Sequence, residues 1–198
     1  MKLSAADSAA KRKTILAAGI RLIRQNGPDG IGIQEIADEA EIPKGSFYNY
    51  FPSKDRFLIE ALEDYTRNAI SWNDQALQKA GYGRFALFSL YEEKVTLEKQ
   101  FLKDGLSCLI SVLSQHSSEK KPELRKELGR SLDAIANAIL NSLQVSADDS
   151  TADKILLLIR TVEASWRGAM LLARATGDES YLENFLSVHR NLILGKEL

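Results

Sequence analysis

The amino-acid sequence predicts an all-α protein, in which a small N-terminal helix-turn-helix domain of three helices precedes a larger helical domain. Apolar residues recur at three- and four-residue steps along most of the chain, as they do on one face of an α-helix. Near the N terminus, two short helical patterns joined by a tight turn follow a longer one, which is typical of a helix-turn-helix. No segment has the alternating pattern of a strand. We expect the two domains to cover residues 1–52 and 53–198.

The composition is that of an ordinary globular protein, since 44% of the 198 residues are hydrophobic and 27% are charged. No apolar run approaches the roughly 20 residues that span a membrane, so we expect no membrane partner. The N-terminal segment lacks the apolar core of a signal peptide, which predicts a cytoplasmic location. Because the formal net charge is −1, any contact with nucleic acid depends on a local patch.

The first helix is predicted from Lys11 to about Asn26, after a loose arm over residues 1–10. Gly27 and Pro28 end it, since Gly adopts the left-handed cap and Pro does not continue a helix. The cations at positions 11–13 oppose the helix dipole at its N-terminal end. They either face a polyanion or form a solvated surface cluster.

Two short helices follow, over residues 33–40 and 44–51, and the turn at residues 41–43 separates them. Phe47 and Phe51 are four residues apart and anchor one face of the second helix in the core. The rest of that helix mixes a cation, hydroxyls and an amide, which are groups that contact phosphates and base edges. These side chains belong to Lys44, Ser46, Tyr48, Asn49 and Tyr50, and Gly45 lets the backbone approach a groove closely. The alternative, a core helix rich in aromatic residues, does not account for the Lys, Ser and Asn.

The segment from Ile15 to Lys54 resembles the DNA-binding domain of the TetR family of bacterial regulators. The matching motifs are Ile36-Ala37, the apolar Ile42 and, above all, the run from Lys44 to Lys54, which fits K-G-[ST]-[FL]-Y-x-[YH]-F-x-[ST]-K. The resemblance implies that the helix at 44–51 enters the major groove and that Lys54 clamps a phosphate. The implied DNA-facing residues are Lys44, Gly45, Ser46, Tyr48, Asn49, Tyr50 and Lys54. Among them we expect Asn49 to contact a base directly, and adenine suits an amide best.

The sequence departs from the family pattern at two places. Ile31 and Gly32 stand where the family often has Thr or Ser as a helix cap and phosphate contact. Glu41 stands in the turn where Gly is common. If that position is left-handed, Glu costs on the order of 1 kcal/mol relative to Gly, and its charge repels the DNA backbone.

The larger domain is predicted to consist of helices throughout. We expect a helix that begins at Ser53 and ends before Gly81, then helices over 84–100, 105–116, 122–145, 152–175 and 180–194, with a loop at 146–150. The last two helices are apolar nearly all round, and such helices need partners on several sides. A two-fold interface supplies them, and the resemblance likewise implies a homodimer that forms through these two helices.

The resemblance also implies a small-molecule pocket in the larger domain. Candidate lining residues, each of which has plain core packing as its alternative, are Trp72, Phe88, Tyr91, Phe101, Cys108, Val112, Leu140, Glu163 and Trp166. The segments around Cys108 and Pro122 resemble a subgroup of these regulators that senses electrophiles or oxidants through one cysteine. The alternative for Cys108 is a buried, inert thiol.

Other functional classes lack support in the sequence. The two histidines, His116 and His189, have no partners at ligand spacing, so we expect no metal site. No nucleophile elbow, P-loop or dinucleotide fingerprint is present, so we expect neither an enzyme nor a cofactor. The sequence therefore predicts a regulator, by default a repressor, that binds an inverted-repeat operator in double-stranded DNA as a dimer and responds to a small molecule. The alternatives are a helical enzyme or ligand-binding module with a vestigial helix-turn-helix, and an architectural DNA binder without a ligand.

Overall fold

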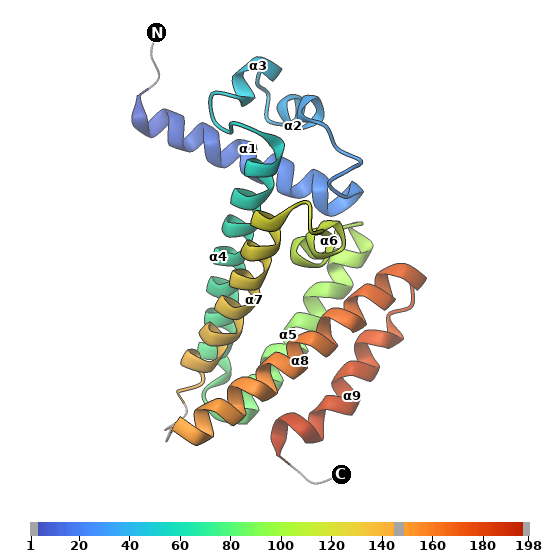
Figure 1. Cartoon of the computed structure of the whole chain (residues 1–198). Coiled ribbons are helices and arrows are strands. Elements are labelled where there is room, and N and C mark those ends of the chain that lie inside the picture. Colours follow the sequence, from blue (N-terminus) through green and yellow to red (C-terminus); the bar gives the residue numbers. More distant parts are fainter. Residues whose placement is uncertain (1–3, 145–148, 196–198) are drawn as a thin grey trace. The chain divides into compact units, whose positions relative to one another are not determined.

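The computed structural model describes residues 4–144 and 149–195, and within them the only regular structure is helical, which confirms the predicted fold class. The helices drawn in Figure 1 are α1 (Ala5–Asn26), α2 (Ile33–Glu39), α3 (Lys44–Phe47), α4 (Lys54–Ala80), α5 (Gly83–Lys103), α6 (Leu109–His116), α7 (Pro122–Ser142), α8 (Asp149–Thr176) and α9 (Ser180–Leu194). Over the same residues, none of these helices combines the length and the apolar character that a membrane span requires.

The chain forms two compact units, and each contains two stretches of sequence. The first unit comprises residues 1–65 and 106–131, and therefore holds α1 to α3, the start of α4, α6 and the start of α7. The second comprises residues 66–105 and 132–198, and holds α5, α8, α9 and the remainder of α4 and α7. These two units are defined by their compactness and not by their function. The domain boundary predicted after residue 52 therefore stays a prediction.

The N-terminal helix is longer than predicted. It begins at Ala5, and the side chain of Ser4 accepts a hydrogen bond from the backbone N–H of Asp7 at 3.1 Å. The loose arm expected over residues 1–10 is therefore wrong from Ala5 onward, because an N-cap followed by alanines favours a helix. The other end agrees with the prediction, since Gly27 has φ 76° and its N–H donates to the carbonyl of Ile23.

Several later boundaries also differ from the predictions. α6 begins at Leu109 rather than at Gly105, because Gly105 has φ 70° and stands in the turn before the helix. α8 begins at Asp149, before the expected residue 152, and of the loop predicted at 146–150, residues 146–148 lie outside the described ranges. Ser53 and Pro122 agree with their predicted roles: the hydroxyl of Ser53 accepts from the N–H of Arg56 at 3.1 Å, and Pro122 opens α7.

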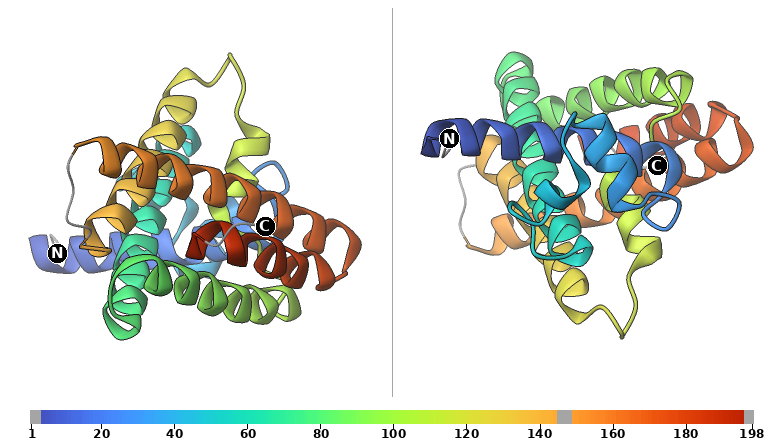
Figure 2. Two further views of the ribbon diagram at one scale, coloured as in Figure 1. Left: turned by 90° about the horizontal axis from the view of Figure 1, so that it is seen from below. Right: turned by 90° about the horizontal axis from the view of Figure 1, so that it is seen from above.

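The helix-turn-helix is built on an aromatic and aliphatic core within the first unit. In the right-hand view of Figure 2, α2 and α3 lie next to each other over α1. The fully buried side chains of α1 to α4 and of the turn after α3 include Ile15, Ile23, Ile36, Phe47, Phe51 and Phe57. Burial of each large apolar side chain contributes about 1.5–3 kcal/mol, so this core fixes how the short helices are presented.

In the second unit, α9 packs against both α5 and α8 (Figure 1). The buried side chains of these three helices include Leu87, Leu90, Tyr91, Ile159, Val162 and Leu182. Other apolar side chains of α8 and α9 remain exposed, namely Leu157, Leu171, Leu172, Val188 and Leu192. α8 and α9 therefore carry exposed apolar residues in addition to those that are buried within the second unit.

Candidate nucleic-acid interface

The helix predicted to read DNA is shorter in the structure than in the sequence analysis. α3 ends at Phe47, so the helix expected over 44–51 is wrong in its second half. The chain continues as a tighter turn, in which the N–H of Asn49 donates to the carbonyl of Ser46 at 3.1 Å, and that of Tyr50 to Phe47 at 2.9 Å. These two bonds span three residues, which is the pattern of a 3₁₀ turn, whereas the N–H of Phe51 donates to the carbonyl of Phe47, four residues earlier, at 3.0 Å. Residues 48–50 therefore continue the right-handed path of α3, although the regular helix has ended at Phe47.

Phe47 and Phe51 lie in the core, as predicted, and both are fully buried. Together with Phe57 of α4 they form an aromatic cluster, with ring centroids 5.3 Å apart for Phe47 and Phe51, 5.5 Å for Phe47 and Phe57, and 5.0 Å for Phe51 and Phe57. Such pairs are worth about 0.5–1.5 kcal/mol each beyond the area that they bury. The cluster holds the segment of residues 44–51, called the reading segment below, against α4.

The polar residues of the reading segment lie on its outer side. Lys44, Gly45 and Asn49 are exposed, and the side chain of Tyr48 is 53% exposed, whereas Ser46 and Tyr50 are half-buried. No atom lies within 4 Å of the position that a Cβ would occupy at Gly45. The structure therefore brings all six predicted residues onto one short segment and leaves the backbone at Gly45 open to a close approach.

The turn between α2 and α3 has the strained conformation that the sequence analysis considered. Glu41 has φ 53°, which is the left-handed region. A non-glycine residue there costs on the order of 1 kcal/mol relative to Gly. Its side chain is exposed, so the carboxylate stands in solvent beside the reading segment.

The start of α2 lacks the side-chain cap that Ser or Thr would provide. Gly32 occupies the N-cap position, and the carboxylate of Glu35 accepts a hydrogen bond from its N–H at 3.1 Å. Because Gly has no side chain, only this half of a capping box is present. This chain therefore has no side-chain hydroxyl at this position to make the phosphate contact that the family pattern implies.

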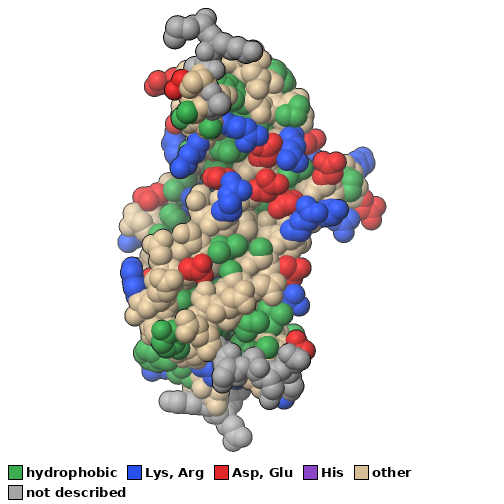
Figure 3. All heavy atoms as spheres, turned by 90° about the vertical axis from the view of Figure 1, so that its left-hand side faces the viewer, with side chains coloured by type: hydrophobic (Ala, Val, Ile, Leu, Met, Phe, Trp, Pro, Cys, Tyr) green, Lys and Arg blue, Asp and Glu red, His purple; other side chains and the backbone are tan. Residues whose placement is uncertain are grey.

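Two of the three cations at positions 11–13, which lie beyond the first turn of α1 because the helix begins at Ala5, are engaged within the first unit. Arg12 pairs with Glu60, and its guanidinium carbon lies 4.5 Å from the centroid of the Phe51 ring. The ammonium of Lys11 donates to the carbonyl of Ala40 at 3.3 Å. Arg12 therefore fits neither of the two predicted roles, since it joins α1 to α4 and to the aromatic cluster. On the face drawn in Figure 3, Lys and Arg side chains are interspersed with Asp and Glu rather than gathered in one basic area.

Lys54 lies in a different environment from the one expected of a phosphate clamp. It is the first residue of α4 and is half-buried. Its ammonium donates to the carbonyl of Pro28 at 2.5 Å and also to that of Ile31. Both acceptors belong to the loop between α1 and α2, a contact that the sequence pattern did not indicate.

Three of the predicted effector residues come together in the second unit. The hydroxyl of Tyr91 donates to the carboxylate of Glu163 at 2.9 Å, and the rings of Tyr91 and Trp166 lie 5.5 Å and 5.3 Å from that of Phe185. Glu163 also binds the ammonium of Lys94 at 2.5 Å and the guanidinium of Arg167 at 3.0 Å. Sequence reasoning missed these two cations, although the four-residue spacing of Glu163 and Arg167 on one helix was a usable signal.

The environment of this cluster keeps Glu163 ionised. Burial alone would raise the pKa of Glu163, but the charges of Lys94 and Arg167 and the hydrogen bonds to the carboxylate outweigh it and hold the pKa below its ordinary value of 4.5. Burial, followed by the nearby carboxylate, raises the pKa of Tyr91 well above 10.0. The carboxylate oxygens are thus occupied by the chain's own donors.

The other predicted effector residues differ in burial and in the unit to which they belong. Phe88 is buried with the guanidinium of Arg190 5.5 Å from its ring centroid, and Trp72, Phe101 and Leu140 are half-buried. Cys108 and Val112 belong to the first unit.

Cys108 is the N-cap residue of α6 and is half-exposed. The preceding residue, Ser107, forms two hydrogen bonds with Arg24 of α1, as a donor in one and as an acceptor in the other. The N–H of Ser107 donates to the carbonyl of Arg24 at 3.0 Å, and the Arg24 side chain donates to the carbonyl of Ser107 at 2.7 Å. The backbone next to Cys108 is therefore fixed to the C-terminal end of α1.

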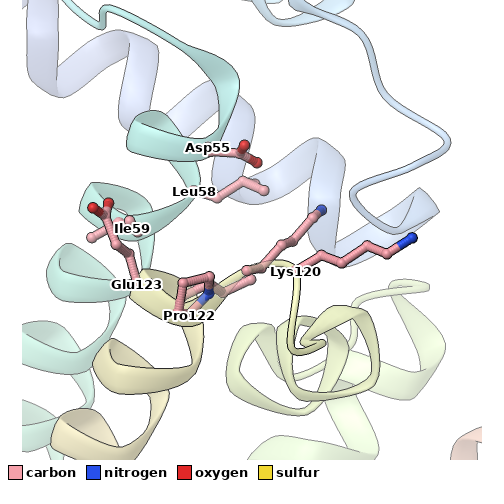
Figure 4. Close-up of a pocket in the computed structure, with 8 residues that line it drawn as sticks. Asp55, Leu58, Ile59, Lys120, Pro122 and Glu123 are labelled. Atoms are coloured by element: carbon pink, nitrogen blue, oxygen red, sulfur yellow. The ribbon is translucent and has the colours of Figure 1, made fainter.

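A pocket of about 240 Å³ lies within the first unit, between the start of α4 and the segment that opens α7 (Figure 4). Its lining residues are Asp55, Leu58, Ile59, Lys120, Lys121, Pro122, Glu123 and Leu124. None of the predicted effector residues lines this pocket. Within residues 4–144 and 149–195, the His, Cys, Asp and Glu side chains form no group of three or more that would suit a metal ion.

Comparison with known proteins finds relatives over most of the chain. A family described as "Bacterial regulatory proteins, tetR family" matches residues 15–61. The HTH-type transcriptional repressor NemR of Escherichia coli (strain K12) is 27% identical over 191 residues, 92% of this chain and 93% of NemR. The HTH-type transcriptional repressor DhaR of Mycobacterium sp. (strain GP1) is 27% identical over 182 residues, 89% of each chain. The crystal structure of the reduced form of E. coli NemR is similar with a TM-score of 0.75 and 27% identity, over 93% of this chain and 97% of NemR.

Proposed function

The chain belongs to the tetR family of bacterial regulatory proteins, and we propose on that premise that it is a ligand-responsive transcriptional repressor. It binds an inverted-repeat operator in double-stranded DNA as a homodimer, and a small molecule releases it. Relatives that match about nine-tenths of the chain are named as transcriptional repressors, which supports regulation rather than catalysis.

One observation carries the DNA-binding part of this proposal. The aromatic cluster of Phe47, Phe51 and Phe57 holds a segment whose outer side presents Lys44, Gly45 and Asn49 to solvent. A cation for phosphates, an amide for base edges and an open backbone are what a major-groove reader needs. A helical module without a DNA function has no use for this combination on an exposed surface.

The test is a selection of bound sequences from random duplex DNA by the purified protein. An inverted repeat should be enriched, because two copies related by two-fold symmetry read two half-sites. The Asn49→Ala variant should lose the preference at one position of each half-site, at a cost of about 1–3 kcal/mol per bidentate contact. If the folded protein enriches no sequence at low salt, the ligand-binding module becomes the better description. Binding without sequence preference would instead favour an architectural DNA binder.

Homodimer formation through α8 and α9 is supported by their uncovered apolar residues. The exposed fraction is 67% for Leu157 and Val188, 45% for Leu171 and Leu172, and 47% for Leu192. Ala164 and Gly168, which also lie on the exposed side of α8, would permit a close approach of helices. Several exposed apolar side chains on one pair of helices support an interaction site, and a second copy of the same pair would be complementary to it.

We expect Val188→Glu to convert the dimer to a monomer, because two carboxylates would be buried near the two-fold axis without partners. Sedimentation at micromolar protein concentration measures the change, and operator affinity should fall with it. Leu132→Glu is the control, since Leu132 is an exposed leucine of α7 and the substitution should leave the dimer intact. A dimeric Val188→Glu protein would place the interface elsewhere.

We further propose that the effector is an electrophile or oxidant that reacts at Cys108. Cys108 is half-exposed, which favours access by small reagents. Its neighbour Ser107 is hydrogen-bonded to Arg24 of α1, so a change at Cys108 could act directly on the first helix. With an electrophile that carries an activated C=C bond, such as a maleimide, a bond forms from carbon to Sγ as the C=C π bond opens, and the thiol proton passes to the neighbouring carbon. Alkylation of the native protein with N-ethylmaleimide, followed by mass spectrometry, should find Cys108 modified and operator binding lost, while Cys108→Ser should bind DNA and resist the reagent. An unmodified Cys108 would rule out this effector class.

A further inference from the structure

We propose that Lys54 is a positioning residue, which holds the loop between α1 and α2 (residues 27–32) so that the reading segment is correctly placed, and does not serve as a phosphate contact. This inference rests on the proposed DNA-binding function, and it changes the role that the family resemblance implied for Lys54. The bonds from its ammonium to the carbonyls of Pro28 and Ile31 point to this role.

The two acceptors are carbonyls that no helix uses. Pro28 and Ile31 lie after the end of α1 and before the start of α2, so their oxygens need donors from elsewhere. A lysine ammonium has three N–H donors, and two of them are directed into this loop. Charge-assisted bonds of this kind are stronger than neutral ones, and the half-buried position of Lys54 limits competition from water.

The loop that Lys54 holds sets where α2 begins. Ile31 is followed directly by Gly32, the N-cap of α2, which has no side chain to define the cap itself. Because the usual side-chain cap is missing, the bond to the Ile31 carbonyl supplies a restraint at the same place. Lys54 therefore compensates for the departure from the family pattern at Gly32.

The same turn of α4 holds the other end of the helix-turn-helix. Phe57 lies three residues after Lys54 and packs its ring on Phe47 and Phe51, which carry the reading segment. α2 and α3 also pack on each other. The first turn of α4 thus fixes α2 through Lys54 and α3 through Phe57, and the orientation of the pair depends on both contacts.

Salt dependence separates a positioning residue from a phosphate contact. Each phosphate neutralised by a cation contributes about −0.9 to the slope of log K against log salt concentration. Removal of a phosphate contact from both copies of a dimer therefore lowers the magnitude of the slope by about 1.8. Removal of a positioning residue weakens binding to the selected operator, and leaves the slope and the affinity for random duplex unchanged.

The experiment measures affinity for the selected operator and for random duplex between 50 and 200 mM salt for Lys54→Met, with Lys44→Met as the matched control at an exposed lysine. We expect Lys54→Met to lose at least tenfold in operator affinity with an unchanged slope, and Lys44→Met to lose slope. Lys54→Gln, which keeps an N–H donor without the charge, should recover part of the loss. A slope reduced as much in Lys54→Met as in Lys44→Met would overturn the proposal.

A second readout needs no DNA. Amide hydrogen exchange over residues 29–35 should be faster in Lys54→Met than in the wild-type protein and unchanged in Lys44→Met. Unaltered exchange in Lys54→Met would contradict the positioning role even if the DNA measurements agreed with it. If the wild-type protein selects no operator while exchange responds as expected, the proposed function fails and the structural role of Lys54 stands.

Discussion

Glu163→Gln should lower the free energy of unfolding by about 3 kcal/mol at pH 7, because it removes the carboxylate from a buried ion cluster. The side chain of Glu163 is 8% exposed and binds Lys94 and Arg167 at once. Loss of one member of such a cluster is costly since the cations stay buried and lose a strong acceptor. The hydrogen bond from Tyr91 can survive, because a Gln oxygen still accepts it.

The same substitution should change how stability depends on pH. The folded protein holds the pKa of Glu163 below its ordinary value, so the carboxylate contributes stability that is fully present above the unfolded pKa, near 4.5, and is lost as pH falls through the folded pKa. Wild-type protein should therefore lose stability steeply below about pH 5. Glu163→Gln has no proton to gain there, so the difference between the two proteins should shrink as pH falls.

Urea unfolding at pH 7 and at pH 4 measures both effects. Glu183→Gln is the control, since Glu183 forms an ion pair with Lys99 at 2.7 Å while its side chain is 64% exposed. Exposed pairs contribute less than about 1 kcal/mol, so this variant should remain close to wild type at pH 7. If both variants lost the same amount of stability, the buried cluster would be no stronger than a surface pair.

The reading segment could be predicted from sequence because its signals are local. Phe47 and Phe51 are one turn apart, and the polar residues between them have no role in a core. The fold class and the order of helices follow from periodicity for the same reason. The short length of α3 could not be predicted, because a segment this short contains too few turns for its periodicity to distinguish an α-helix from a 3₁₀ turn.

Contacts between residues far apart in the chain were beyond the sequence analysis. Lys54 was expected at a phosphate because its motif says nothing about the carbonyls of Pro28 and Ile31, which lie more than twenty residues earlier. Glu163 was selected as a candidate ligand contact, but its main partner Lys94 lies on another helix. A charge on the apolar face of a helix indicates a partner, and only the fold reveals whether that partner is a ligand or the chain itself.

Gly19→Ala should destabilise the protein by about 1–2 kcal/mol, although the same change in an open helix stabilises it by up to about 1 kcal/mol. Gly19 lies in the middle of α1, where a methyl group would overlap the ring of Phe57, with its Cε1 only 2.8 Å away, and would lie 3.3 Å from Cγ2 of Ile36. The Phe57 ring is fully buried and packs against Phe47 and Phe51, so its displacement would disturb the aromatic cluster. The absence of a side chain at Gly19 is therefore what allows α1 to approach the aromatic cluster.

Gly129→Ala, in the same unit, should instead raise the free energy of unfolding. Gly129 is an exposed position within α7, and no atom lies within 4 Å of the Cβ that alanine would add. Chemical denaturation should show Gly129→Ala gaining stability and Gly19→Ala losing it, and only Gly19→Ala should also lower affinity for the selected operator, since the displaced ring supports Phe47 of the reading segment. Equal gains in both variants would mean that α1 and α4 pack loosely enough to absorb a methyl group. In that case the orientation of the reading segment would have to depend on the loop held by Lys54 rather than on the aromatic cluster.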